Sequence, residues 1–342
     1  MSRSNHEILP RVAVAGAGYW GKNLVRNFHS LGALGRVCDS SEETLSLISG
    51  QYQGIAVTRD YAELINDPRL DAIVLATPAE SHYSMAREAL LAGKDVFVEK
   101  PLSLRSVHGE ELVRLARSGG RILMTGHLLH YHPAIRKISE LVDSGEIGSL
   151  YYMSSNRLNL GKLRREENVL WSFAPHDVSV MLMLAGASPD SVLASGGSFI
   201  QPGIHDTTMT CLSFPGGIRG HIYVSWLHPF KDHKLVVIGS RRMLVFDDLE
   251  DGEKIRLYDK GVDSPETLQI RSNGFEVIPF VPDEPLKLEC EHFLDCVRCR
   301  RQPETDGESG VRVLRVLEAA QESLDGGGKA VAMNHEVYAR SI

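Results

Sequence analysis

The chain has 342 residues, of which 43% are hydrophobic and 24% charged, so it is long enough for two globular domains with buried cores. Its 37 basic and 44 acidic side chains give a net charge of −7, which argues against nucleic acid or an anionic membrane as a partner, because both attract a basic surface. No apolar run approaches the roughly 20 residues that span a bilayer, and Met1 to Pro10 is polar. With five cysteines and no secretory pattern, we expect a cytoplasmic protein with reduced thiols.

Short apolar runs alternate with helical stretches between residues 11 and 126. Their apolar character is continuous, which is typical of parallel strands covered on both faces. Alternation of strands and helices predicts a doubly wound parallel sheet. The predicted strands are 12–15, 34–38, 72–76, 96–98 and 122–125, and the predicted helices lie near 20–31, 41–49, 60–66, 79–92 and 103–118.

The first predicted strand runs directly into a glycine loop with the sequence Gly-Ala-Gly-Tyr-Trp-Gly, residues 16–21. Between a strand and a helix, this spacing is typical of a dinucleotide-binding turn. Gly16 permits the tight turn, Gly18 lets the backbone approach a pyrophosphate, and Gly21 allows close packing of helix and strand. The alternative is a turn that binds no ligand.

Asp39 follows at the end of the second predicted strand, where an acid binds the ribose hydroxyls of an adenosine. Its charge repels a 2′-phosphate, so the sequence favours NAD over NADP. We expect Tyr19, Trp20 and Ser40 to lie beside the same cofactor.

Two further segments follow predicted strands, and ligands of open parallel sheets bind at the carboxyl ends of strands. Thr77 and Pro78 are expected to contact the cofactor, to cap the next helix, or both. His82 is also expected beside the cofactor, and as a helix-face residue it is expected to pack rather than to catalyse. The second segment is Glu99-Lys100-Pro101, and both Glu99 and Lys100 are expected to lie beside the cofactor. Lys100 is expected to point into the cofactor crevice, where an ammonium can donate to a reacting hydroxyl and lower its pKa.

Strands dominate the second half of the chain. They are predicted near 150–158, 192–200, 206–214, 218–227, 234–239 and 242–247, and serial strands separated by turns predict an antiparallel sheet. Helices are predicted at 133–142, 173–184, 289–299 and 310–324.

These motifs together resemble the Gfo/Idh/MocA family of nicotinamide-dependent sugar oxidoreductases. The resemblance rests on the loop 16–21, Asp39, Ala76-Thr77-Pro78 with His82, Glu99-Lys100-Pro101-Leu102, Gly145-Glu146-Ile147-Gly148, and the stretch from Glu289 to Gly328. It implies an NAD-binding Rossmann domain, residues 1–126, followed by an α/β domain, residues 127–342. The second domain would carry a large open-faced, mainly antiparallel sheet, through which a homodimer or homotetramer would form.

The resemblance also implies two catalytic residues, Lys100 and His176. The family's lysine maps onto Lys100, and its usual histidine, ten residues before a glycine that ends a helix, maps onto His176 with Gly186 as that glycine. Many members have an aspartate four residues before the histidine, but here Ser172 stands there and Asp177 follows instead. A histidine suits removal of an alcohol proton near neutral pH.

Polar residues before His176 are expected to form a substrate rim. Arg157 would bind a phosphate or carboxylate, and Asn159 and Asn168 would bind sugar hydroxyls. The substrate set is completed by Lys100, His127, Tyr131, Trp171, His176 and Asp177. A solvated surface loop is the alternative for the stretch around residues 161–168.

A His-x-x-His-x-His cluster, His127, His130 and His132, raises the possibility of a metal site. No carboxylate or cysteine accompanies it at a fixed spacing, and oxidation of a sugar by NAD needs no metal. We therefore predict no metal, and expect His127 and Tyr131 to line the sugar pocket. Cys290, Cys296 and Cys299 are expected to be packing residues.

Within the family, the sequence looks most like nucleotide-sugar 3-dehydrogenases. This implies oxidation of UDP-N-acetylglucosamine, or its uronic acid, to a 3-keto sugar for a partner aminotransferase, as in lipopolysaccharide biosynthesis. The alternatives are an inositol or free-sugar dehydrogenase of the same family, or a non-catalytic NAD-binding regulator. A regulator would not need both Lys100 and His176.

Overall fold

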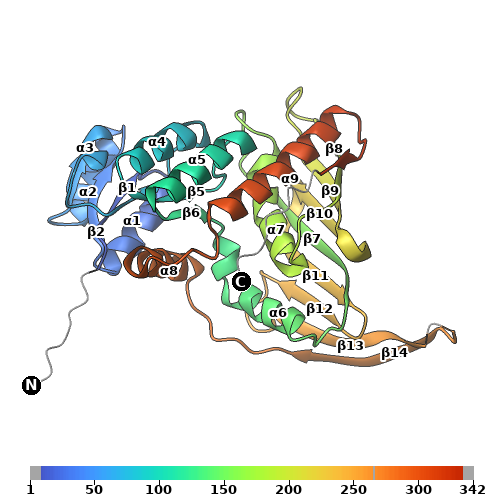
Figure 1. The fold of residues 1–342 in the computed structure, drawn as a ribbon. Coiled ribbons are helices and arrows are strands. Elements are labelled where there is room, and N and C mark those ends of the chain that lie inside the picture. Colours follow the sequence, from blue (N-terminus) through green and yellow to red (C-terminus); the bar gives the residue numbers. More distant parts are fainter. Residues whose placement is uncertain (1–8, 265, 334–342) are drawn as a thin grey trace, which may run out of the picture. The chain divides into compact units, whose positions relative to one another are not determined.

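The computed structural model describes residues 9–264 and 266–333, which fall into two compact units (Figure 1). The first unit comprises Met1–Tyr131 and Asp283–Leu314, and the second comprises His132–Pro282 and Arg315–Ile342. Neither unit is continuous in sequence. Residues 283–314 lie beyond the predicted domain boundary at 126/127, yet they pack with the first unit.

The first unit contains a six-stranded parallel sheet in the order β3-β2-β1-β4-β5-β6. This order reverses between β1 and β4, so it confirms the predicted doubly wound sheet. Only the short β3, which is partly exposed, was absent from the predicted strands. The strands are β1 (Val12–Ala15), β2 (Leu34–Cys38), β3 (Ala56–Thr58), β4 (Ala72–Leu75), β5 (Asp95–Glu99) and β6 (Leu123–Gly126).

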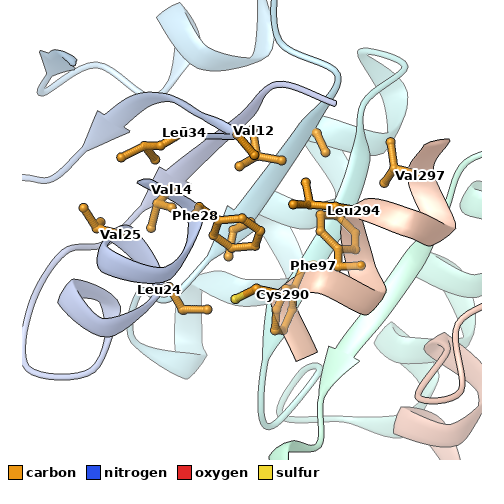
Figure 2. Close-up of a cluster of buried hydrophobic side chains, with 14 of the residues drawn as sticks. Val12, Val14, Leu24, Val25, Phe28, Leu34, Phe97, Cys290, Leu294 and Val297 are labelled. Carbon is orange, nitrogen blue, oxygen red and sulfur yellow. The ribbon is translucent and has the colours of Figure 1, made fainter. Parts of the chain in front are cut away.

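Helices of the first unit bury their apolar faces against this sheet. Three aromatic rings carry the contact on one face: Phe293 lies 5.5 Å from Phe97 and 6.4 Å from Phe28, measured between ring centroids. Figure 2 shows Phe28 and Phe97 in this cluster together with Cys290 and Leu294. Because Phe293 belongs to α8, the returning segment completes the core. The helices are α1 (Gly21–Ser30), α2 (Glu42–Gln51), α3 (Ala62–Ile65), α4 (Ala79–Leu91), α5 (Ser106–Gly119), the 3-10 helix η1 (Leu128–Tyr131), α8 (Pro285–Cys299) and the beginning of α9 (Gly307–Asp325).

The second unit contains a nine-stranded sheet in the order β14-β13-β12-β11-β7-β10-β9-β8-β15. All its pairs are antiparallel except β7 with β10, so the prediction of a mainly antiparallel sheet is confirmed. Its strands are β7 (Leu150–Leu160), β8 (Ser191–Gly197), β9 (Thr207–Ser213), β10 (Arg219–Ser225), β11 (Leu227–Gly239), β12 (Met243–Asp247), β13 (Ile255–Ser264), β14 (Gln269–Val277) and β15 (Val331–Ala332). The helical elements are α6 (Pro133–Asp143), α7 (Val169–Ala185), η2 (Pro215–Gly217) and the end of α9.

One face of this sheet is covered by helices and the other is open. Along β7, Met153 and Ser155 are buried beneath α7, whereas Tyr152 points the other way and is exposed. Leu193 of β8 and Met209 of β9 are exposed in the same alternating pattern. Alternation of buried and exposed positions is the mark of a sheet with one free face.

Candidate active site

The glycine loop has the backbone that its sequence predicts. Gly16 has a φ of +88°, and a Cβ there would lie 2.6 Å from the carbonyl oxygen of Ala76. A Cβ at Gly21 would overlap the carbonyl oxygen of Gly16, so α1 can start this close to the loop only from a glycine. Gly18 differs, because no atom of the described residues, its two chain neighbours aside, lies within 4 Å of a Cβ built there. The backbone at Gly18 is therefore open to a ligand.

Asp39 is fastened to this loop. One carboxylate oxygen accepts a hydrogen bond from the backbone N–H of Ala17 at 2.7 Å, and the other accepts from Ser41 at 2.8 Å. Ser40, beside it, is exposed. The acid thus lies at the carboxyl end of β2 and next to the loop, as a ribose-binding acid must. Tyr19 and Trp20, also predicted near the cofactor, are exposed.

His82 links the ends of two neighbouring strands. Its Nδ1 lies 2.7 Å from the carbonyl oxygen of Pro101, and its Nε2 lies 2.8 Å from that of Thr77. Burial lowers the pKa of this imidazole, and the two carbonyls oppose that shift. Both nitrogens are thereby engaged by protein, which supports the packing alternative. Pro78 immediately precedes α4 and makes no side-chain cap.

Glu99 connects the glycine loop to the lysine motif at the end of β5. Its Oε1 accepts a hydrogen bond from the indole Nε1 of Trp20 at 2.6 Å, and its Oε2 accepts from the backbone N–H of Lys100 at 3.3 Å. Burial raises the pKa of Glu99 to about 7, and these donors together with the Lys100 charge act in the opposite direction. The carboxyl thus holds the Trp20 side chain close to the backbone of Lys100.

His127 and Tyr131 are both buried in the first unit. Neither ring nitrogen of His127 has a hydrogen-bond partner among the described residues, and burial lowers its pKa to about 3, so the ring is neutral at physiological pH. The charge of Lys100 contributes to that shift. The Tyr131 hydroxyl lies 3.0 Å from Oγ1 of Thr305, and the whole side chain is enclosed in the core. His127 therefore offers free polar atoms to a ligand, whereas the Tyr131 hydroxyl has a protein partner.

In the second unit, the carboxylate of Asp177 binds two side chains of β7. Its carboxylate accepts from the Ser155 hydroxyl at 2.5 Å and from Nε of Arg157 at 2.8 Å. These residues alternate along β7 and therefore share one face, the face toward α7. Both Asp177 oxygens are engaged in this way, so its contacts orient Arg157. Burial alone would lower the pKa of Arg157, but the facing carboxylate raises it, which keeps the guanidinium charged.

The remaining predicted substrate residues come from β7 and α7. Asn168 caps the helix by accepting from the N–H of Trp171 at 3.3 Å, and its amide donates to Gln321 at 2.8 Å. Oδ1 of Asn159 is buried without a partner among the described residues. His176 lies in the middle of α7 and is partly exposed. The helix ends at Ala185, and Gly186 follows with a φ of 62°, as the family pattern implied.

Two structural residues escaped the sequence analysis. Asp206, fully buried, accepts from the N–H groups of Phe199 and Ile200 and from the indole of Trp226, all at 2.6–2.9 Å. It shapes the loop before β9. Glu289 of α8 is also fully buried. No motif marks Asp206, because its partners are backbone groups or lie far away in sequence. Glu289 lies in the stretch that carries the family resemblance, but no local pattern predicts that its side chain is buried.

Within residues 9–264 and 266–333, no three or more His, Cys, Asp or Glu side chains gather as a metal site would require. In the same part of the chain, no helix combines the length and the hydropathy needed to cross a membrane.

Comparison with known proteins identifies two matching family profiles. Residues 10–127 match the profile described as "Oxidoreductase family, NAD-binding Rossmann fold", and residues 135–245 match the "GFO/IDH/MocA C-terminal domain". Among curated relatives, the UDP-N-acetylglucosamine 3-dehydrogenase of Acidithiobacillus ferrooxidans is 24% identical over 89% of this chain and 94% of its own length. The NAD-dependent scyllo-inositol 2-dehydrogenase of Bacillus subtilis is 26% identical over 72% of this chain and 73% of its own length.

Solved structures show the same fold. The structure of the A. ferrooxidans enzyme, GnnA, has a TM-score of 0.83 at 23% identity, covering 94% of this chain and 99% of that one. GenD2 from gentamicin A biosynthesis, solved in complex with NAD, has a TM-score of 0.81 at 23% identity, covering 98% and 99%. At these identities the likeness establishes the fold and leaves the substrate open.

Proposed function

Because the chain belongs to the Gfo/Idh/MocA family of NAD-binding oxidoreductases, we propose that it oxidises a secondary alcohol of a nucleotide sugar. The proposed substrate is UDP-N-acetylglucosamine, or its uronic acid, with the C3 hydroxyl converted to a ketone. The observation that carries the proposal is that a dinucleotide loop with its ribose acid, Asp39, occurs in one chain with Lys100 and His176, a charged donor and a proton acceptor.

The residues of the first unit fit the cofactor. The open backbone at Gly18 suits a pyrophosphate, Asp39 suits the adenosine ribose, and the start of α1 favours negative charge. If the adenosine binds at the end of β2, the nicotinamide binds at the other half of the sheet, at the ends of β4 to β6. When bound, NAD supplies the hydride acceptor. Everything else in the mechanism falls to side chains of this chain.

In the proposed mechanism, His176 removes the proton of the substrate hydroxyl. Lys100 donates a hydrogen bond to the same oxygen and stabilises the negative charge that develops on it. The neutral ring of His127 is a candidate to hold a neighbouring sugar hydroxyl, since both its nitrogens lack protein partners among the described residues. Lys100 belongs to the first unit and His176 to the second.

The substrate assignment is supported by the A. ferrooxidans relative and by Arg157, whose charged guanidinium suits a phosphate or a uronic acid carboxylate. A polyol such as an inositol is the second candidate. The B. subtilis relative is named for its action on scyllo-inositol, and its sequence identity to this chain, 26%, is close to the 24% of the A. ferrooxidans enzyme. Asn159 and Asn168 would bind hydroxyls of either substrate.

The proposed setting follows from this chemistry. A 3-keto sugar is the substrate that a partner aminotransferase would need, as in lipopolysaccharide biosynthesis, and the cytoplasm is where we propose that the two enzymes act. We further propose that two or four copies associate through the open face of the nine-stranded sheet, where Tyr152, Leu193 and Met209 are exposed. Exposed apolar groups gathered on one surface are typical of an interface.

A substrate screen tests the proposal. The purified protein would be incubated with NAD and, separately, with UDP-N-acetylglucosamine, its uronic acid, scyllo-inositol, myo-inositol and free hexoses, and NADH formation would be followed by absorbance. We expect turnover with a UDP-sugar at a kcat/KM well above that of every free sugar. A preference for an inositol would replace the substrate assignment, and no turnover with any alcohol would contradict the enzymatic proposal.

A further inference from the structure

The packing of β5 against α8 places two glutamates on the same side of the first unit. Phe97 and Phe293 are in contact, with ring centroids 5.5 Å apart. Glu99 follows Phe97 by two residues along a strand and so points to the same face. Glu289 precedes Phe293 by four residues, about one helical turn, and so lies on the same face of α8. The two carboxyls therefore belong to one buried layer between β5 and α8.

Both carboxyls are removed from water, but they differ in their hydrogen bonds. Glu99 is 8% exposed and accepts from Trp20 and Lys100. Glu289 is 0% exposed, and neither of its oxygens has a partner among the described residues. Gly126 helps to enclose Glu99, because a Cβ there would lie 3.0 Å from the carboxylate. A carboxylate with no donor in such a place is costly, which favours a bound proton on Glu289.

The titratable groups facing the pair do not neutralise two negative charges. Lys100, from the end of β5, is the cation that lowers the pKa of Glu99. Tyr131 of η1 and Cys290 of α8 both have a raised pKa, partly because of Glu289, so they stay uncharged. Burial raises the pKa of Glu289 well above its usual value, and Glu99 raises it further. Among residues 9–264 and 266–333, Lys100 is therefore the one positive charge that acts on these two acids.

We propose that Glu99 and Glu289 hold one proton between them in the free protein, and that this proton is released to solvent when NAD⁺ binds. The nicotinamide of NAD⁺ carries a positive charge, and its proposed place is at the carboxyl ends of β4 to β6, where Glu99 lies. A nearby cation favours the ionised carboxylates. The O–H bond of the carboxylic acid breaks, the proton goes to the buffer, and no electron moves. NADH has an uncharged ring and leaves the proton on the pair.

Calorimetry measures this proton directly. NAD⁺ and NADH would each be titrated into the protein at neutral pH in phosphate and in Tris, whose heats of ionisation differ. The inference predicts about half to one proton released per NAD⁺ bound and none per NADH, because only the first ligand carries the ring charge. Equal binding heats for NAD⁺ in the two buffers, or equal proton release with both nucleotides, would overturn it.

Variants assign the proton to the pair. Glu289→Gln should abolish the buffer dependence while NAD⁺ still binds, and Glu99→Gln should do the same. Glu291→Gln is the matched control, because that side chain lies on the same helix but faces solvent, and it should behave as the unaltered protein does. Proton release that persists in both Glu99→Gln and Glu289→Gln would assign it elsewhere and refute the pair.

The inference rests on the proposed function only for the position of the nicotinamide. A failure of this inference can be distinguished from a failure of the proposed function, because the binding heats are measured without any sugar. Buffer-independent binding refutes the carboxyl pair and leaves the dehydrogenase proposal intact. Proton release as predicted, without turnover of any alcohol, would support the carboxyl pair and contradict the dehydrogenase proposal.

Discussion

Asp39 has two roles at the residue scale, since it already holds the glycine loop and would also bind the ribose. Asp39→Ala should weaken NAD much more than NADP, because repulsion of the 2′-phosphate disappears together with the ribose hydrogen bonds. A charge-assisted hydrogen bond contributes about 1.5–3 kcal/mol, so we expect NAD affinity to fall roughly 10- to 150-fold. Titration calorimetry with both nucleotides checks this, and an unchanged NAD/NADP ratio would remove Asp39 from the site.

Lys100 is the residue on which the electrostatic part of the mechanism depends. Lys100→Met keeps the apolar stem and removes the charge, so NAD affinity should hold while kcat falls by about 10²- to 10³-fold, as when one donor to a developing oxyanion is lost. Calorimetry and steady-state rates are measured on the same preparation. Wild-type turnover with intact cofactor binding would show that Lys100 has no part in the reaction.

The sequence predicts such residues where a motif fixes the backbone around them. Asp39 and Lys100 both follow buried parallel strands, so their place at the carboxyl edge of the sheet could be derived from the strand pattern alone. The partners of Arg157 could not be derived in this way. Its bond to Asp177 joins residues 20 positions apart. Glu289 was also out of reach, because helix periodicity does not reveal an acid on a buried face.

At the scale of the elements, Gly18, which precedes α1, and Gly21, which begins it, are expected to have different roles. Gly21→Ala should destabilise the protein by about 1–3 kcal/mol, because the new methyl group meets the backbone carbonyl of Gly16 and must push loop and helix apart. Gly18→Ala is the matched variant, since open space surrounds that position. It should leave the melting temperature unchanged and still weaken NAD, whose pyrophosphate needs the space.

Thermal unfolding and NAD titration of both variants distinguish the effect on stability from the effect on NAD affinity. Equal losses of stability would show that Gly18 is a structural glycine. Unchanged NAD affinity in Gly18→Ala would mean that the pyrophosphate does not approach the loop at this residue.

Elements were predicted best where burial is complete. The parallel strands other than β3 were predicted because both of their faces are apolar, and α7 was predicted from its largely apolar sequence. β13 and β14 were not predicted. β14 is exposed along almost its whole length, so it has no apolar face that would mark it as a strand. The bounds of β11 were also too short at its beginning, where residues 227–233 are largely exposed.

At the scale of the whole molecule, the sequence indicated two domains but not the path of the chain between them. Residues 283–314 return to the first unit because α8 supplies apolar side chains, among them Phe293 and Leu294, to the core beside β1 and β5. Nothing local distinguishes that helix from one that packs on the second sheet. Topology of this kind depends on contacts between distant segments, which a single sequence does not report.

Self-association is the prediction that belongs to this scale. Met209→Glu places a charge on the open face of the sheet, where the side chain is 48% exposed, and should shift a dimer or tetramer toward monomer. Leu47→Glu is the control, because Leu47 is also an exposed apolar residue but lies on α2 of the first unit. Sedimentation equilibrium reports the masses. An unchanged mass for Met209→Glu, or dissociation by Leu47→Glu, would place the interface elsewhere.

The pH dependence of His176→Asn tests the central claim most directly. If His176 is the base, kcat/KM of the unaltered enzyme with a UDP-sugar should rise with pH through the neutral range, because only the neutral imidazole accepts the hydroxyl proton. His176→Asn should lower the rate by about 10²- to 10⁴-fold and abolish that rise, while NAD affinity stays the same. If the variant instead turns over at the wild-type rate with the same pH profile, His176 is a structural residue and the proposed mechanism is wrong.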